Sequence, residues 1–255
     1  KPDLYRAYLL RANIYKTRGD NAAVLAEARA IAAANPKDGE ALVYAAGISC
    51  GMVDRATCLA AFDRAIAVEP TVYAYINRLR WRTADDVAGR RADIAAGLKL
   101  DPENADLLAA DAELLFTSGD YQGAVNALAS LTARQDAEGK YTPATHLKLA
   151  IAMARSGQKA LADREIAGVM KHAADNASAL NTICWDLAIA NVALDRALAA
   201  CDAALAQNPE NPALLDSRGF VMLRRGDYAA AIASYDKAIA IRPKMPESLY
   251  GRGLA

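Results

Sequence analysis

The sequence has no excess charge of either sign and no long apolar run. Thirty basic residues balance thirty acidic ones among its 255 residues. A chain without net charge has no strong field to attract nucleic acid or an anionic membrane surface. No stretch approaches the roughly 18 apolar residues of a membrane-spanning helix. We therefore expect no nucleic-acid partner and no membrane insertion.

Residues that carry chemistry are also scarce. His146 and His172 are the only histidines, and neither has a second histidine at metal-ligand spacing. The phosphate-binding glycine motifs are absent from the sequence. The segment Gly251-Arg252-Gly253 is too short to form one. The paired acids Asp85 and Asp86 are typical of a turn and a helix cap. The sequence thus predicts no catalytic site, no metal and no cofactor, and it predicts a packing role for His146.

Aromatic residues make up only 6% of a chain that is 54% hydrophobic, and much of the apolar content is alanine. Alanine has the highest helix propensity, and its small side chain lets helices approach closely. This composition favours tightly packed helices over a β-sandwich.

The prolines have a regular spacing. Pro36 and Pro70 lie 34 residues apart, as do Pro209 and Pro243, and Pro102 follows Pro70 by 32 residues. Each proline follows an apolar run, and a proline just beyond a helix ends it. Such a period indicates a repeated structural unit.

A second marker lies between the prolines. Gly19-Asp20, Gly119-Asp120 and Gly226-Asp227 each precede an apolar run. Glycine adopts the left-handed conformation that ends a helix, and aspartate caps the start of the next one. Each unit is therefore predicted to be a helix, a tight turn, a second helix and a proline break.

The stretch 212–245 resembles the tetratricopeptide repeat family. The small, aromatic and proline positions of that family's 34-residue frame are occupied here by Gly219, Gly226, Tyr228, Ala231, Tyr235, Ala238 and Pro243. The resemblance implies an all-α fold, a right-handed superhelical solenoid of stacked antiparallel helix pairs. An ordinary helical bundle with accidental periodicity is the alternative.

The frame extends along the chain as a single solenoid over residues 1–255, with about seven repeats and a partial eighth. The expected repeats are 5–38, 39–70, 71–104, 105–142, 143–177, 178–211, 212–245 and 246–255. Arg78 and Arg90 occupy positions where small residues belong, so either the helices of 71–104 splay or the register is wrong there. Extra residues near 136–142 predict a longer loop.

The four cysteines fall in two repeats. Cys50 and Cys58 lie on either side of one turn, and Cys184 and Cys201 lie on the two helices of a later repeat. Packed antiparallel helices can bring such Cα atoms within disulfide range. The alternative is that all four are small buried hydrophobic residues. Disulfides would indicate an oxidising compartment.

The resemblance also implies a concave groove lined by the first helix of each repeat, which would hold a protein or peptide partner. In some family members, lysine and asparagine residues clamp a terminal carboxylate. Leu9, Asn13 and Tyr44 occupy the matching positions here, so that clamp is absent. The predicted groove residues are Leu9, Asn13, Val43, Tyr75, Leu79, Arg82, Glu113, Phe116, Ile151, Arg155, Asp186, Phe220, Arg224 and Tyr250.

The last predicted helix carries an apolar face formed by Leu249, Tyr250 and Leu254. Solenoids normally finish with a polar face. We therefore expect either that the sequence is part of a longer protein or that copies of the chain associate through residues 246–255.

A narrower resemblance involves the segments 180–185, 201–202, 215–219 and 249–255. They look like the C-terminal repeat region of exported alphaproteobacterial proteins, some of which carry a retropepsin-like protease domain. The expected function is a non-catalytic interaction scaffold in the bacterial periplasm. The alternatives are the partner-positioning half of a larger enzyme, such as an exported protease, and a cytoplasmic location.

Overall fold

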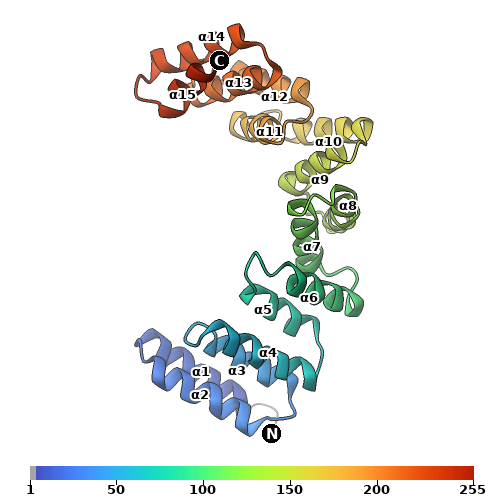
Figure 1. Ribbon diagram of the computed structural model, residues 1–255, viewed down its shortest axis with the longest axis vertical. Coiled ribbons are helices and arrows are strands. Elements are labelled where there is room, and N and C mark those ends of the chain that lie inside the picture. Colours follow the sequence, from blue (N-terminus) through green and yellow to red (C-terminus); the bar gives the residue numbers. More distant parts are fainter. Residues whose placement is uncertain (1–3) are drawn as a thin grey trace. The chain divides into compact units, whose positions relative to one another are not determined.

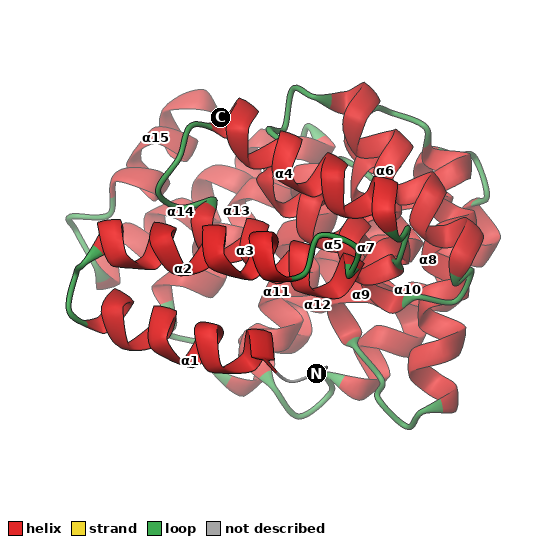
Figure 2. Ribbon diagram, turned by 90° about the horizontal axis from the view of Figure 1, so that it is seen from below, coloured by secondary structure: helices red, strands yellow, loops and turns green. Residues whose placement is uncertain are grey.

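The computed structural model describes residues 4–255, and this part of the chain contains fifteen helices and no strand (Figure 1 and Figure 2). The all-α fold predicted from the sequence is confirmed. None of these helices is long and apolar enough to cross a membrane. The helices are α1 (Leu4–Thr17), α2 (Asn21–Ala34), α3 (Gly39–Ser49), α4 (Arg55–Val68), α5 (Val72–Trp81), α6 (Val87–Leu100), α7 (Ala105–Thr117), α8 (Tyr121–Ala137), α9 (Pro143–Arg155), α10 (Lys159–His172), α11 (Ala177–Ala190), α12 (Leu194–Gln207), α13 (Pro212–Arg225), α14 (Tyr228–Ile241) and α15 (Pro246–Leu254).

The chain divides into two compact units, Lys1–Leu114 and Leu115–Ala255, with the boundary inside α7. Within each unit, most consecutive helices pack on one another, and so do the first helices of neighbouring pairs, such as α3 with α5 and α11 with α13. Each unit is therefore a stack of helix pairs. A single solenoid over residues 1–255 stays a prediction.

Aspartates begin many of the second helices. The carboxylates of Asp20, Asp54, Asp86, Asp120 and Asp227 each accept a hydrogen bond from a backbone N–H in the first turn of the following helix. These bonds satisfy one of the donors that every helix N-terminus leaves unpaired. Gly226 ends α13 with a φ of 81°, which glycine adopts without steric cost. The helix–turn–helix prediction from the Gly-Asp pairs is confirmed.

The predicted repeat frame over 71–104 is one residue out of phase, which explains why Arg78 fell on a position where a small residue belongs. Thr71 caps α5, so Val72 corresponds to Pro212, the first residue of α13, and Arg78 corresponds to Arg218. Arg78 pairs with Asp63 of the preceding pair, as Arg218 does with Asp202. Arg252 of α15 pairs in the same way with Asp236. Arg78 thus belongs to a repeated ion pair between neighbouring helix pairs, and it also pairs with Asp93 of α6 inside its own pair.

The extra residues of 105–142 mainly lengthen a helix, and the following loop, 138–142, is longer than the other loops between helix pairs by only one or two residues. α8 continues to Ala137 and has 17 residues, whereas α2, α4 and α6 each have 14. The segment Leu128–Thr132 keeps apolar residues on its buried face, and nothing before Gly139 breaks the helix.

A second register error affects α11. This helix begins at Ala177, and Asn191 takes the left-handed conformation (φ 53°) that Gly226 takes in the next pair. Ala193 also has a positive φ, of 46°, so this turn is one residue longer. Cys184 therefore corresponds to Gly219, and Trp185 corresponds to Phe220.

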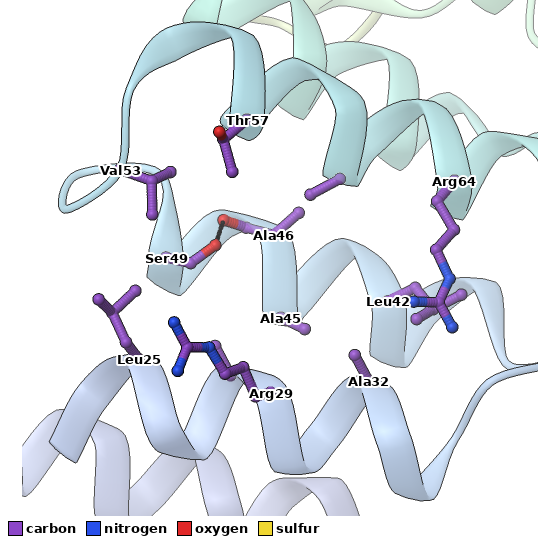
Figure 3. Close-up of a pocket in the computed structure, with 12 residues that line it drawn as sticks. Leu25, Arg29, Ala32, Leu42, Ala45, Ala46, Ser49, Val53, Thr57 and Arg64 are labelled. Carbon is purple, nitrogen blue, oxygen red and sulfur yellow. Dashed lines mark hydrogen bonds between the residues drawn. The ribbon is translucent and has the colours of Figure 1, made fainter. Parts of the chain in front are cut away.

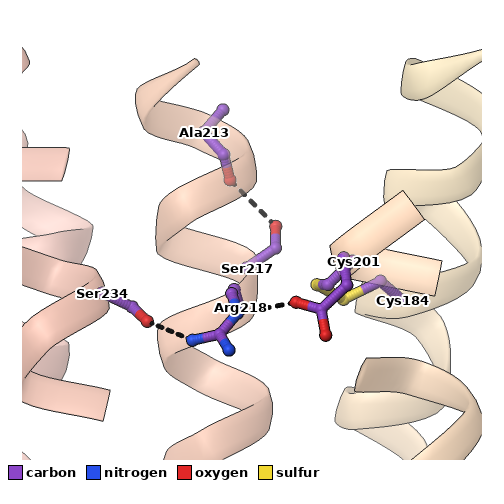
Figure 4. The surroundings of a disulfide bond; sticks show 7 residues. Cys184, Cys201, Ala213, Ser217, Arg218 and Ser234 are labelled. Atoms are coloured by element: carbon purple, nitrogen blue, oxygen red, sulfur yellow. Dashed lines mark hydrogen bonds and ion pairs between the residues drawn. A yellow bond between two sulfur atoms is a disulfide. The ribbon is translucent and has the colours of Figure 1, made fainter. Parts of the chain in front are cut away.

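Both predicted cysteine pairs form disulfides. Cys50 bonds to Cys58 with the Cα atoms 4.8 Å apart, and Cys184 bonds to Cys201 at 5.3 Å. The second bond joins α11 to α12 in the core of the second unit. Figure 4 shows Arg218 beside it, donating hydrogen bonds to Asp202 at 2.8 Å and to Ser234 at 3.0 Å.

Tyr235 occupies a core position that requires two glycines. Its side chain is buried between α13 and α15, and a Cβ atom at either Gly219 or Gly251 would collide with its ring. The closest approach between these helices therefore depends on glycine at both positions. Burial raises the pKa of the Tyr235 hydroxyl.

Candidate functional site

The first helices of the second unit form a hollow of about 420 Å³ over α9. Four of the predicted groove residues line it: Phe116, Ile151, Arg155 and Asp186. Its size falls within the range of small-ligand sites, roughly 300–1,000 Å³. The complete lining is Phe116, Ala144, Leu147, Lys148, Ile151, Arg155, Asp186, Ile189 and Ala190.

Two predicted groove arginines hold the C-terminal end of α11. Arg155 donates to the Ala190 carbonyl at 2.6 Å, and Arg224 donates to the Ala188 carbonyl at 3.2 Å. The last carbonyls of a helix lack intrahelical partners and carry partial negative charge. Both arginines therefore have a structural role that the sequence analysis did not foresee.

An apolar row continues from this hollow along the second unit. Ile151, Trp185, Phe220 and Leu254 occupy equivalent positions on α9, α11, α13 and α15, counted from the first residue of each helix. We call these four residues the groove row. The rings of Trp185 and Phe220 lie 5.1 Å apart, and Trp185 and Leu254 are 38% and 57% exposed. Ile151 is buried at 7% exposure and Phe220 is partly buried, so Trp185 and Leu254 are the exposed members of the row. Exposed apolar residues that gather beside a hollow often mark a binding surface.

Trp185 shows what the sequence analysis missed. The register error at α11 put Asp186 in the position that Trp185 occupies, so the tryptophan was left out of the predicted groove. The contact between Trp185 and Phe220 places it there. Ile189, which is 54% exposed, lines the hollow with Phe116. Tyr250, on α15, is exposed as predicted.

A second hollow, of about 440 Å³, lies between α9, the end of α10 and α11. Asp186 lines both hollows and is half-buried. Desolvation by burial raises the pKa of its carboxyl group above the usual value.

His146 packs inside the second unit. It is buried, its Nε2 lies 3.2 Å from Asp136, and its Nδ1 contacts Glu165. Tyr141 stacks on its ring at 4.3 Å and on His172 at 3.9 Å. Across residues 4–255, no three His, Cys, Asp or Glu side chains are grouped so that they could hold a metal ion.

The predicted groove residues of the first unit are more dispersed. Leu9, Tyr75 and Leu79 are partly buried, and Asn13 and Glu113 are exposed. The prediction for Val43 is wrong, because its side chain lies in the core at 2% exposure.

Arg82 of the first unit is held by carboxylates rather than free for a partner. Its Nε donates to Asp93 at 2.6 Å and its Nη1 to Asp86 at 2.6 Å. A feature that the sequence analysis missed is the row Tyr5–Tyr44–Tyr73, whose neighbouring ring centroids are each 5.6 Å apart.

The first unit also has a hollow of about 230 Å³ between α2, α3 and α4 (Figure 3). Small residues such as Ala32, Ala45 and Ala46 leave this space open, and Arg29 and Arg64 lie at its edges. It lies outside the predicted groove, and the signal for it in the sequence is the excess of alanine on facing helices.

Residues 223–255 match the family model of the TPR repeat. No curated protein matches the sequence.

Several solved structures share the fold. A tetratricopeptide repeat protein from Parabacteroides merdae is 16% identical, with 98% of each chain covered and a TM-score of 0.60. The C-terminal part of a TPR repeat-containing protein from Cytophaga hutchinsonii is 12% identical, with 94% of this chain and 98% of the other covered and a TM-score of 0.63. A structure of Naa15/Naa10 bound to HypK-THB is 17% identical, covers 97% of this chain and 38% of the other, and has a TM-score of 0.55. These identities show likeness of fold alone.

Proposed function

Because the chain has the tetratricopeptide-repeat fold, we propose that it is a non-catalytic scaffold that binds another polypeptide. The observation that supports this most directly is the groove row beside the hollow over α9. The bound segment lies extended across the first helices of the second unit. Its apolar side chains contact Trp185 and Phe220, and one of them enters the hollow against Phe116.

This assignment is consistent with the chemistry of the surface. Aromatic side chains supply much of the free energy at protein interfaces because they bury large areas at a low cost in conformational entropy. Trp185 and Phe220 are already in contact, so little ordering of these side chains is required on binding. The two arginines that hold the end of α11 keep the surface rigid.

A peptide-display selection tests the proposal. We expect random peptides selected on the full chain to lose about tenfold or more in affinity when Trp185→Ala or Phe220→Ala is introduced. The matched control is Tyr228→Ala, which removes a 55% exposed aromatic from a second helix and leaves binding unchanged. Circular dichroism checks that each variant is folded. Peptides that bind all three variants with the wild-type affinity would place the binding surface elsewhere.

We infer that the chain functions in an oxidising compartment such as the bacterial periplasm. The two disulfides support this location, because cytosolic reductants keep most thiols reduced. Thiol titration of denatured protein taken from its native source provides the test, and we expect no free thiol. Four free thiols would favour the cytoplasmic alternative.

The alternative function, positioning of a substrate for a catalytic domain in the same larger protein, uses the same groove. It differs in requiring a catalytic domain in the same gene. The gene sequence upstream of the segment that encodes Lys1 distinguishes the two functions.

A further inference from the structure

The hollow between α9, the end of α10 and α11 combines apolar walls with a single carboxylate. Leu147, Val169 and Ile183 supply apolar surface, and Asp186 is the only acidic side chain in the lining. The complete lining is Thr142, Pro143, Ala144, Leu147, Val169, His172, Ala173, Asn176, Ala179, Thr182, Ile183 and Asp186.

Asp186 has no hydrogen bond or ion pair to any other residue in the part of the chain that the structure describes. The two cations of the adjoining hollow are engaged elsewhere. Arg155 contacts the Ala190 carbonyl and the Tyr121 hydroxyl, and Lys148 lies 5.4 Å from the centre of the Phe116 ring. A half-buried carboxylate without a partner is costly, and a cation that reached it would offset that cost.

His172 is the other titratable group in the lining. Its Nδ1 lies 3.1 Å from the carbonyl of Gly168, and its ring stacks on Tyr141. Both contacts hold the imidazole against α10 and the α8–α9 loop.

We propose that this hollow takes a lysine or arginine side chain of the bound polypeptide, with its cationic head on Asp186. The aliphatic stem of such a side chain packs on Leu147 and Ile183, since lysine and arginine bury their methylene groups along apolar surfaces. A charge-assisted hydrogen bond to the carboxylate then fixes the head. The proposal rests on the proposed function, because it assigns one side chain of the polypeptide bound in the groove.

Parallel peptide selections provide the test. Random peptides are selected on the wild-type chain, on Asp186→Asn and on Asp175→Asn. Asp175 is an exposed aspartate that does not line the hollow, so its variant makes the same charge change. We expect enrichment of lysine or arginine at one position in the wild-type and Asp175→Asn pools, and none in the Asp186→Asn pool.

A selected peptide then gives a quantitative test. Replacing its basic residue with norleucine should weaken binding about tenfold or more, the amount expected for a hydrogen bond to a charged group. The same replacement should have no effect on the Asp186→Asn chain. In the complex, the pKa of Asp186 measured by carboxyl ¹³C NMR should fall with the basic peptide and stay raised with the norleucine peptide.

The possible failures can be told apart. Peptides that depend on Trp185 and Phe220 but show no basic preference would overturn this inference and leave the proposed function intact. The same conclusion would follow if the Asp186→Asn chain kept the preference. If no selected peptide depended on the groove row, both proposals would fail.

Discussion

At the scale of single residues, the first unit contains a buried carboxylate with two arginine partners. Asp93 is fully buried and accepts hydrogen bonds from Arg78 Nε at 3.0 Å and from Arg82 Nε at 2.6 Å. Arg78 also reaches Asp63, whose side chain is 61% exposed. One arginine therefore has a buried and an exposed partner, which allows a matched comparison of the two.

Asp93→Asn should lower the free energy of unfolding by about 3–5 kcal/mol, because two partly buried guanidinium groups lose the buried one of their two carboxylate partners. Asp63→Asn is the control and should cost about 0–1 kcal/mol, since water solvates that side of the pair. Trp81 lies next to Arg82, and the only other tryptophan is Trp185. Urea unfolding followed by Trp81 fluorescence in a Trp185→Phe background therefore reports on the first unit. Equal effects of the two substitutions would contradict this prediction.

At the scale of helices, close packing depends on where a glycine lies. A Cβ atom at Gly219 would lie 2.7 Å from the Tyr235 ring, whereas one at Gly168, in α10, would meet nothing within 4 Å. Both residues are inside helices, so the gain in helix propensity on substitution is the same for both.

Gly168→Ala should therefore stabilise the protein by up to about 1 kcal/mol, through helix propensity alone. Gly219→Ala should destabilise it by about 1–3 kcal/mol, because the new methyl group displaces Tyr235 from its buried position. Thermal unfolding monitored by circular dichroism measures both. If Gly219→Ala raised the midpoint as Gly168→Ala does, Tyr235 would have room that the structure does not show.

Most helix pairs could be predicted from the sequence. The residue at which the repeat frame begins could not be predicted on α5 and α11, where the frame was wrong by one residue. Proline spacing and Gly-Asp pairs locate most helices because these residues act locally on the backbone. The turns before α6 and α12 lack a Gly-Asp pair, and in the turn before α12 Asn191 and Ala193 take the left-handed conformation instead. An arginine that follows an aspartate of the preceding helix pair, by 16 residues in Asp202–Arg218 and by 15 in Asp63–Arg78, marks the phase of α5. The equivalent position of α11 is Ile183, so this signal is missing there.

At the scale of the whole molecule, the sequence indicated several residues that line the hollow over α9 but not the shape of that hollow. Phe116, Ile151 and Arg155 were predicted by position and line it, and Asp186, which the register error at α11 added to the prediction, lines it too. The hollow itself depends on how side chains of three helices fill the space between them. Small residues such as Ala144 and Ala190 leave part of that space empty, and a repeat pattern carries no information about such volumes.

Association of copies through residues 246–255 remains a prediction at this scale. Leu249, Tyr250 and Leu254 of α15 are 44%, 71% and 57% exposed, while Ser248 and Gly251 of the same helix are buried. An exposed apolar helix face buries its surface when two copies meet.

We therefore expect the mass measured by light scattering to rise above 27.0 kDa with increasing concentration. Leu249→Lys should remove that rise, and the control Leu10→Lys, which changes a 64% exposed leucine of α1, should not. If the wild-type chain stayed monomeric at every concentration, this prediction would fail and the exposed face of α15 would belong to the groove alone. Leu254 of that face already continues the row formed by Ile151, Trp185 and Phe220.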